Sequence, residues 1–297
     1  MKVLLIGIYA LGAQALAGLL RRGFEIVGVV SKADQGPGQR ALLDLVRQSQ
    51  LPLLTPENPR EPSFLNSVEK LIPDVIVVAG YHLRIPNRIL NLPRLGILNV
   101  HLSLLPRYRG PSPWKWAILR GETKTGVTVH VMTPRFDQGA ILAQKECPIS
   151  DEETGESLFV RLSTLGAELL PEVLEQIRTG TSNRRPQDEG QASYDPALTD
   201  DDARIRWQRS ASEIRDQIRG LHPRPGAWTT WDGTRIRILR ASLGGLSPSE
   251  NPPGTILDSN GTMAIVTGSG TLNVQEWRND QPALSRSPSP VLSNVLV

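Results

Sequence analysis

The sequence predicts an α/β fold, a doubly wound and mainly parallel sheet, followed by a smaller antiparallel barrel or sandwich. Over the first 180 residues, short apolar runs alternate with stretches of helical periodicity. From Thr179 to Asp202 the composition turns to polar residues and glycine, which is typical of a linker. Beyond it, short apolar runs are separated by glycine, Asp-Gly and Asn-Gly turns.

The first domain is predicted over residues 1–180. Lys2 to Ile6 is a continuous apolar run, the pattern of a strand that is covered on both faces. Val75 to Ala79 is the most apolar run of the chain, so we expect it at the centre of the sheet. Further strands are predicted at 25–30, 52–54, 96–101, 127–132 and 141–146. Helices are predicted at 13–22, 40–50, 64–71, 85–90, 114–119 and 156–178.

A length of 297 residues leaves room for a second domain. Residues 181–202 are predicted as the linker and 203–283 as the C-terminal domain, which begins with a helix at 211–220. The last stretch, 284–297, contains Ser287-Pro288-Ser289-Pro290, and we expect a mobile tail there. The strands of the C-terminal domain are predicted at 228–231, 235–241, 254–257, 263–267 and 272–277.

Composition limits the classes of partner. The net charge of +3 is too small an excess to argue for DNA binding. The single cysteine, Cys147, favours a reducing, cytoplasmic setting and rules out a cysteine-based metal site. The apolar N-terminus is interrupted by glycine and polar residues, so it fits a strand, a turn and a helix better than a signal peptide. No later segment reaches the ~20 apolar residues that span a bilayer. We therefore expect no DNA, membrane or metal partner.

The first turn does not have the pattern of a dinucleotide site. Its glycines, Gly7 and Gly12, are five residues apart and do not form the G-x-G-x-x-G fingerprint. No acidic residue closes the second predicted strand, where Ser31 and Lys32 lie instead. The pattern argues against a nicotinamide cofactor.

Two polar side chains end the strand predicted at 96–101. Because side chains alternate along a strand, Asn99 and His101 share one face, and Asp137 follows the next predicted strand. A carboxylate beside an imidazole raises the pKa of the imidazole and orients the ring, which suits a general acid/base, while an amide donor can stabilise an oxyanion. Residue types alone leave a structural histidine, a turn asparagine and a loop-capping aspartate equally open. The same reasoning treats His130 as a packing or surface residue.

Three separated motifs resemble the signature of the folate-dependent formyltransferases. They are Asn99-x-His101-x-Ser103-Leu104-Leu105-Pro106-x-Tyr108-Arg109-Gly110, Gly121-Glu122-Thr123-x-Thr125-Gly126-Val127-Thr128 and Asp137-x-Gly139. The patterns Ala203-Arg204-Ile205-x-Trp207 and Pro223-x-Pro225-Gly226-Ala227 extend the resemblance to about residues 2–241. This family includes methionyl-tRNA, glycinamide ribonucleotide and sugar N-formyltransferases. The resemblance implies a Rossmann-like catalytic domain and an OB-like C-terminal β-barrel.

The resemblance also implies a role for each site residue. Asn99 would polarise the formyl carbonyl, His101 would transfer the proton, and Asp137 would orient His101. The donor would be 10-formyltetrahydrofolate, with no metal. Its pterin would lie against two segments, Leu83, Arg84 and Ile85, and Thr133, Pro134, Arg135 and Phe136. Contacts with the acceptor are expected from Tyr9, Ser103, Arg107, Tyr108 and Arg109; the two arginines could meet a phosphate, although the resemblance implies partly structural work for their loop.

Two departures from the transfer-RNA enzymes favour a small-molecule acceptor. The first turn lacks their usual Gly-Thr-Pro-x-Phe pattern, and the loop at 33–40 is short, with one arginine. A protein that grips an acceptor stem would present lysines and arginines there. Both features resemble the formyltransferase half of the bacterial enzyme that modifies UDP-4-amino-4-deoxyarabinose, although that enzyme often has arginine where this chain has Pro111.

We therefore expect the acceptor to be an amino sugar nucleotide or a secondary-metabolite amine. Formylation of methionyl-tRNA is the alternative within the same chemistry. Two alternatives of other classes stay open, a non-catalytic module that binds folate or a nucleotide, and an enzyme that hydrolyses the folate to formate.

Overall fold

The computed structural model describes the whole chain except residues 34–35, 246–249, 260–261, 281–295 and 297. The chain divides into two compact units, each described by itself below. Two short segments that interrupt the first unit in sequence belong to the second unit, so no single cut along the chain separates the two. The first unit consists of Met1–Pro113, Lys124–Pro148 and Phe159–Pro196, and the second of Trp114–Thr123, Ile149–Leu158 and Ala197–Val297.

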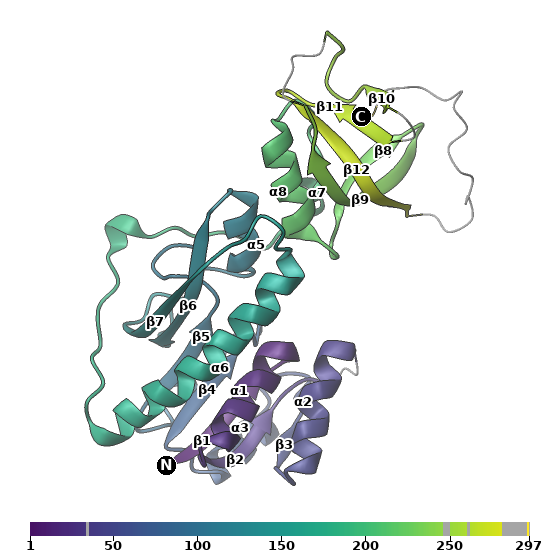
Figure 1. The fold of residues 1–297 in the computed structure, drawn as a ribbon. Coiled ribbons are helices and arrows are strands. Elements are labelled where there is room, and N and C mark those ends of the chain that lie inside the picture. The colour runs from purple at the N-terminus through teal and green to yellow at the C-terminus, as the bar shows by residue number, and fades with distance from the viewer. Residues whose placement is uncertain (34–35, 246–249, 260–261, 281–295, 297) are drawn as a thin grey trace. The chain divides into compact units, whose positions relative to one another are not determined.

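The first unit is built on a seven-stranded sheet with the order β3-β2-β1-β4-β5-β6-β7 (Figure 1). Strands β1 to β5 are parallel, and β6 and β7 are added antiparallel. The mainly parallel sheet is thus confirmed. The strands are β1 (Lys2–Gly7), β2 (Glu25–Val30), β3 (Leu53–Leu54), β4 (Val75–Ala79), β5 (Ile97–His101), β6 (Lys124–Val131) and β7 (Ile141–Pro148).

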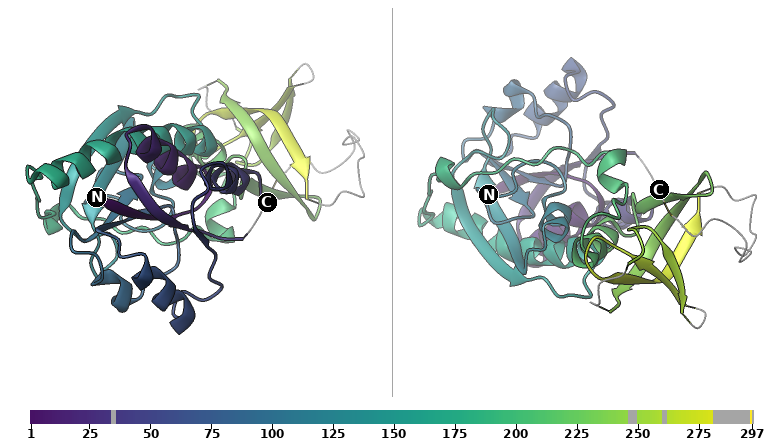
Figure 2. Two further views of the ribbon diagram at one scale, coloured as in Figure 1. Left: turned by 90° about the horizontal axis from the view of Figure 1, so that it is seen from below. Right: turned by 90° about the horizontal axis from the view of Figure 1, so that it is seen from above.

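Helices cover both faces of this sheet, which makes it doubly wound. Leu4, Ile76 and Val78 of the strands share one buried cluster with Phe64 and Val68 of α3. On the opposite face α1 and α6 pack, and Figure 2 shows this purple and teal pair across the sheet from the blue α3. Among the described residues, no helix has both the length and the apolar character needed to cross a membrane. The helices from the N-terminus to α6 are α1 (Tyr9–Arg21), α2 (Pro37–Gln48), α3 (Pro62–Lys70), α4 (Asn87–Leu90), α5 (Pro113–Leu119) and α6 (Gly155–Thr179).

The strand order reverses between β1 and β4. The connection from β1 leads to one side of the sheet and that from β4 to the other. Open α/β sheets bind ligands beyond the carboxyl ends of the strands at such a reversal. Gly7 ends β1, Ala79 ends β4 and His101 ends β5, so the loops that follow them are the first place to look for a site.

The second unit contains a five-stranded antiparallel sheet, order β10-β11-β12-β9-β8, curled against α8 as a half-barrel. Ile214 and Ile218 of α8 join Trp207 and Trp228 in its core, and Nε1 of Trp207 donates to Oγ1 of Thr229 at 3.1 Å. The elements are η1 (Glu189–Gln191) in the first unit, then α7 (Asp200–Ala203), α8 (Ala211–Leu221), β8 (Ala227–Trp231), β9 (Thr234–Leu243), β10 (Ile256–Ser259), β11 (Thr262–Val266) and β12 (Thr271–Asn279).

The domain boundaries drawn from the sequence stay a prediction. The segment predicted as a linker ends within the short helix α7, which begins at a capping box between Thr199 and Asp202. The tail expected at 284–297 lies outside the described residues apart from Leu296. That residue is 3% exposed and belongs to the core of the second unit.

Candidate active site

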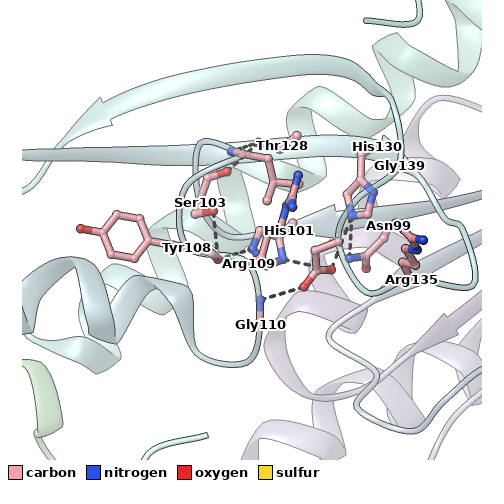
Figure 3. A network of polar contacts seen from close by, with 12 residues as sticks. Asn99, His101, Ser103, Tyr108, Arg109, Gly110, Thr128, His130, Arg135 and Gly139 are labelled. Carbon is pink, nitrogen blue, oxygen red and sulfur yellow. Dashed lines mark hydrogen bonds and ion pairs between the residues drawn. The ribbon is translucent and has the colours of Figure 1, made fainter. Parts of the chain in front are cut away.

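Asn99 and His101 lie on one face near the carboxyl end of β5 (Figure 3). The antiparallel register with β6 places Asn99 opposite His130 and His101 opposite Thr128. Side chains directly opposite each other on one face are close enough to interact. The register therefore adds two polar side chains of β6 to the pair that the sequence predicted.

His130 fixes the orientation of the Asn99 amide. The ring is 1% exposed, its Nδ1 lies 3.0 Å from the carbonyl oxygen of Val131, and its Nε2 lies 3.1 Å from Nδ2 of Asn99. Because a carbonyl only accepts, Nδ1 carries the ring hydrogen and Nε2 accepts from Asn99. Burial, reinforced by the nearby His101, lowers the pKa of His130 to about 4. The ring is thus neutral near pH 7 and accepts one of the two Nδ2 hydrogens of Asn99.

His101 presents one ring nitrogen to Asp137. The ring is 6% exposed, and its Nε2 donates to the carbonyl oxygen of Tyr108 at 2.9 Å. Its Nδ1 lies 3.7 Å from Oδ1 of Asp137, too far for a hydrogen bond and within the range of an ion pair. Nδ1 is therefore the atom that can take up a proton, and Asp137 is placed to balance the resulting charge.

Asp137 lies near His101 although β6, the strand before it, ends at the far end of β5. Because β6 is antiparallel to β5, the loop after β6 begins beside the start of β5, where the Met132 N–H donates to the Ile97 carbonyl at 2.7 Å. The loop then folds back over the face of the sheet. Asp137 lies in the left-handed region, with φ of +55°, and its Oδ2 accepts from the Gly110 N–H at 2.9 Å. Such a conformation costs free energy in a residue other than glycine and needs support from its surroundings.

Polar side chains, two of them fully buried, hold the loop that follows β5. Oγ1 of Thr128 donates to the Ser103 carbonyl at 2.6 Å and accepts from the Leu105 N–H at 3.1 Å. Nε2 of Gln144 donates to the Leu105 carbonyl at 2.8 Å. Ser103 is fully buried and its hydroxyl donates to the Arg107 carbonyl at 2.8 Å. The hydroxyl of Ser103 thus stabilises this turn, and its contact with the acceptor stays a prediction.

Arg109 is buried, and its guanidinium is bound within the chain. Nη1 and Nη2 pair with the carboxylate of Glu189 at 2.9 and 2.7 Å, which lowers the pKa of that carboxyl group. Nε and Nη2 also donate to Oε1 of Gln187 at 3.1 and 2.9 Å. Tyr108 is 5% exposed, whereas Arg107 is exposed, with its guanidinium 5.2 Å from the centre of the Tyr108 ring. Direct contact of these three residues with an acceptor stays a prediction.

The turn that follows the carboxyl end of β1 exposes an aromatic ring. Tyr9 is 39% exposed, with φ of +54°, and its N–H donates to Oε1 of Gln39 at 2.8 Å. Gln39 is fully buried, and its Nε2 donates to Oγ of Ser31 at 2.6 Å and to the Lys32 carbonyl at 3.0 Å. A buried glutamine therefore sets the position of the turn that carries Tyr9.

The two segments expected to contact a pterin differ in exposure. Ile85 is 4% exposed and belongs to the core beneath the sheet, Leu83 is half-buried and Arg84 is exposed. In the other segment Thr133 is half-buried, while Pro134, Arg135 and Phe136 are exposed, Phe136 by 58%. Their backbone groups can meet a ligand, and the assignment itself stays a prediction. Among the described residues, no three His, Cys, Asp or Glu side chains group in a way that could hold a metal ion.

The structure brings Asn99, His101 and Asp137 together as the sequence analysis expected, and it adds His130 and Gln187 around them. A signal for His130 existed in the alternation of β6, since His130 and Thr128 share a face with each other and not with the valines. Nothing local in the sequence points to Gln187.

Comparison with known proteins relates both parts of the chain to formyl transferases. Residues 3–174 match the family model for formyl transferase, and residues 197–285 match the model for the formyl transferase C-terminal domain. The chain is 40% identical over 247 residues to a methionyl-tRNA formyltransferase from Syntrophus aciditrophicus, covering 81% of this chain and 79% of that protein. It is 34% identical over 283 residues to one from Geobacter sulfurreducens, covering 93% and 88%.

Among solved structures, the chain resembles an N-formyltransferase from Helicobacter canadensis in complex with folinic acid and dTDP-3-aminofucose. The TM-score is 0.69 at 19% identity, and the match covers 93% of this chain and 99% of that one. At this identity the likeness concerns the fold.

Proposed function

Because the chain belongs to the formyl transferase family, we propose that it transfers a formyl group from 10-formyltetrahydrofolate to the amino group of methionyl-tRNA. One observation carries the choice of acceptor. Relatives 34–40% identical, matched over 79–88% of their own length, are methionyl-tRNA formyltransferases. This likeness extends over both domains, whereas the small-molecule acceptor expected from the sequence depends on two short loops.

Asn99 acts on the formyl carbonyl in this proposal. With one Nδ2 hydrogen held by His130, the other donates to the carbonyl oxygen, where negative charge develops as the amine attacks. A donor aimed at a developing oxyanion is worth about 10²–10³ in kcat. The neutral state of His130 matters here, because a protonated ring could not accept from the amide.

His101 receives the proton that the attacking nitrogen must lose. Its Nε2 is engaged by the Tyr108 carbonyl, so the proton arrives at Nδ1, and Asp137 stabilises the imidazolium. His101 then returns the proton to the departing nitrogen of the folate, which restores the resting state. The geometry of the three side chains supports this sequence of steps.

Donor binding is assigned to the segments 83–85 and 133–136. They follow β4 and β6, the two strands that neighbour β5. The first begins near the carboxyl end of β5, and the second begins beside the start of β5 and leads to Asp137, which lies 3.7 Å from His101. The complex of the Helicobacter canadensis enzyme with folinic acid, a formyl-tetrahydrofolate, supports a folate donor for this fold.

A small-molecule amine is the second candidate, favoured by a specific observation. The segment between β2 and α2 is six residues long in the sequence, with Lys32 as its single basic residue to meet an acceptor stem. In the second unit, several arginines are paired with carboxylates, including Arg206 with Asp201, and Arg235 with Asp200. Charges neutralised in this way contribute less to binding of a phosphate backbone.

The test measures tetrahydrofolate release from 10-formyltetrahydrofolate with methionyl-tRNA, with a nucleotide-linked amino sugar, and with no amine. We expect turnover with methionyl-tRNA that falls steeply as salt rises, because phosphate contacts release counterions. His101→Ala, assayed in parallel, identifies the release that depends on this site.

Turnover with the amino sugar and none with methionyl-tRNA would replace the proposal by the second candidate. Release without any amine would indicate a hydrolase. Folate binding without release in any condition would indicate a binding module.

A further inference from the structure

Gln187 links the turn of Asp137 to the buried Arg109. Its Nε2 donates to the carbonyl oxygens of Asp137 and Gly139 at 2.6 and 2.8 Å. Its Oε1 accepts from Nε and Nη2 of Arg109. Both partners of the nitrogen are acceptors and both partners of the oxygen are donors, so one orientation of the amide fits and its four hydrogen-bonding positions are filled.

The turn that Gln187 holds cannot rely on its own backbone preference. Asp137 has φ of +55°, a conformation that costs of order 1–3 kcal/mol outside glycine. Two residues later, a Cβ on Gly139 would lie 1.6 Å from the Val131 carbonyl oxygen, so the chain passes close to β6 there. Nε2 of Gln187 donates to the carbonyl of Asp137 and to that of Gly139 at the close approach, which restricts the direction in which the Asp137 side chain leaves the turn.

The same side chain also steadies the second partner of the carboxylate. Oδ2 of Asp137 accepts from the N–H of Gly110, and Gly110 follows Arg109, whose guanidinium Gln187 binds. Gln187 therefore connects the residue that bears the carboxylate to the loop that donates to it. Figure 3 shows Arg109 and Gly110 on the loop beside His101.

Backbone pairing holds the segment of Gln187 at both ends. Arg185 and Ile141 exchange two N–H···O bonds, at 2.8 and 2.9 Å. Further along, the Arg109 N–H donates to the carbonyl oxygen of Ser193 at 2.9 Å, and the Asp195 N–H donates to the carbonyl oxygen of Arg109 at 2.8 Å. A segment 50 residues beyond Asp137 is thus anchored on β7 and on the loop after β5, with Gln187 between the two anchors.

We propose that Gln187 is a positioning residue for formyl transfer, which keeps the Asp137 carboxylate within ion-pair range of Nδ1 of His101. The inference rests on the proposed function, since it assigns Gln187 a part in the same reaction. Gln187 acts through Asp137 and does not itself touch the reacting atoms.

The test compares Gln187→Glu with Glu189→Gln. The carboxylate introduced by Q187E would keep the length of the side chain and its acceptor for Arg109, but it has no hydrogens for the carbonyls of Asp137 and Gly139. Glu189→Gln disturbs Arg109 from the solvent side and leaves the Asp137 turn alone. We expect Q187E to lower kcat about tenfold or more, with KM for 10-formyltetrahydrofolate within about twofold, because small misplacements of catalytic groups are costly. E189Q should keep kcat within about twofold.

Hydrogen exchange supplies a readout that does not need turnover. The Gly110 N–H is protected by the Asp137 carboxylate, so peptides that cover Gly110 should exchange faster in Q187E than in E189Q, while both variants keep their melting temperature within a few degrees.

Unchanged kcat in Q187E would overturn the proposal, and so would equal losses in the two variants, which would indicate general loosening around Arg109. If the wild-type protein transfers no formyl group, the proposed function fails first. The exchange data then decide separately, and equal exchange in both variants would refute the positioning role.

Discussion

Nδ2 of Asn99 lies 3.1 Å from Nε2 of His130, and this contact decides which way the Asn99 amide faces. The acceptor nitrogen is available because the other ring nitrogen of His130 donates to the Val131 carbonyl. His130 of β6 thus orients the N–H of Asn99 that, in the proposed reaction, donates to the developing oxyanion. Three experiments follow from this relationship and from the neighbouring pair, and a fourth concerns packing.

Replacing His130 should weaken catalysis without removing the groups that react. His130→Ala leaves the Asn99 amide without its acceptor, so we expect kcat to fall about 10–100-fold, an effect comparable to partial loss of an oxyanion donor. Steady-state kinetics near neutral pH measures it. His130→Gln provides an acceptor of similar reach and should recover much of the loss. Equal kcat in the wild type and in H130A would refute the orienting role.

The lowered pKa of His130 should appear in the pH dependence of stability. The folded state holds the pKa at about 4, against 6.5 for the free side chain, so the unfolded state binds the proton more readily between these values. The contribution of His130 to the free energy of unfolding is therefore fully present above pH 6.5 and is lost as pH falls towards 4. This loss amounts to at most about 3 kcal/mol. Urea titrations across that range, for the wild type and for His130→Gln, should give a shallower decline in the variant.

His101→Ala should abolish most turnover and leave the fold intact. Loss of a group that receives and returns a proton costs about 10²–10⁴ in rate. The decisive comparison is with Asp137→Asn, which keeps the acceptor oxygen for the Gly110 N–H but cannot balance an imidazolium. We expect a smaller loss in D137N than in H101A. Melting temperatures within a few degrees of the wild type would show that both effects are catalytic, and high residual activity in H101A would sink the role given to this ring.

Gly18 of α1 should resist even the smallest side chain. A Cβ at this position would lie 2.5 Å from the carbonyl oxygen of Ala167 in α6. Pro171, four residues further along α6, has no N–H to donate to that carbonyl. Gly18→Ala should therefore lower the free energy of unfolding by about 1–3 kcal/mol, as overpacking does. Gly38→Ala, in the exposed first turn of α2, meets only ordinary contacts with Tyr9 and should change it by less than about 1 kcal/mol. Similar effects in the two variants would contradict the close packing inferred here.

The sequence predicted those elements whose signal lies within a few consecutive residues. The run Val75–Ala79 matches β4 residue for residue, because a fully apolar stretch of this length has few alternatives to a central strand. Alternation also placed Asn99 and His101 on one face. His130 is buried, as a packing residue would be, but its contact with Asn99 could not be predicted. That contact depends on the register between β5 and β6, and a register is set by both strands together.

Gln187 was hidden for a similar reason, since its partners Asp137 and Arg109 lie 50 and 78 residues away. The polar segment around Gln187 has the composition of a linker whether or not it is bound to the sheet. A polar composition indicates only that a segment can face water. The contacts of Gln187 with Asp137 and Arg109 depend on the folded sheet, which brings distant parts of the chain together.

The pairing of Arg185 with Ile141 has a consequence for the behaviour of the protein in concentrated solution. It closes one end of the outermost strand, β7, where a second molecule could otherwise add a strand of its own. Further along, β7 carries Lys145 and Glu146 and ends at Pro148, which cannot donate to a neighbouring strand. The opposite border, β3, is only two residues long. Both edge strands of the sheet are thus poor templates for pairing with a second molecule. At β7 this protection lasts only while the segment around Arg185 stays paired with Ile141.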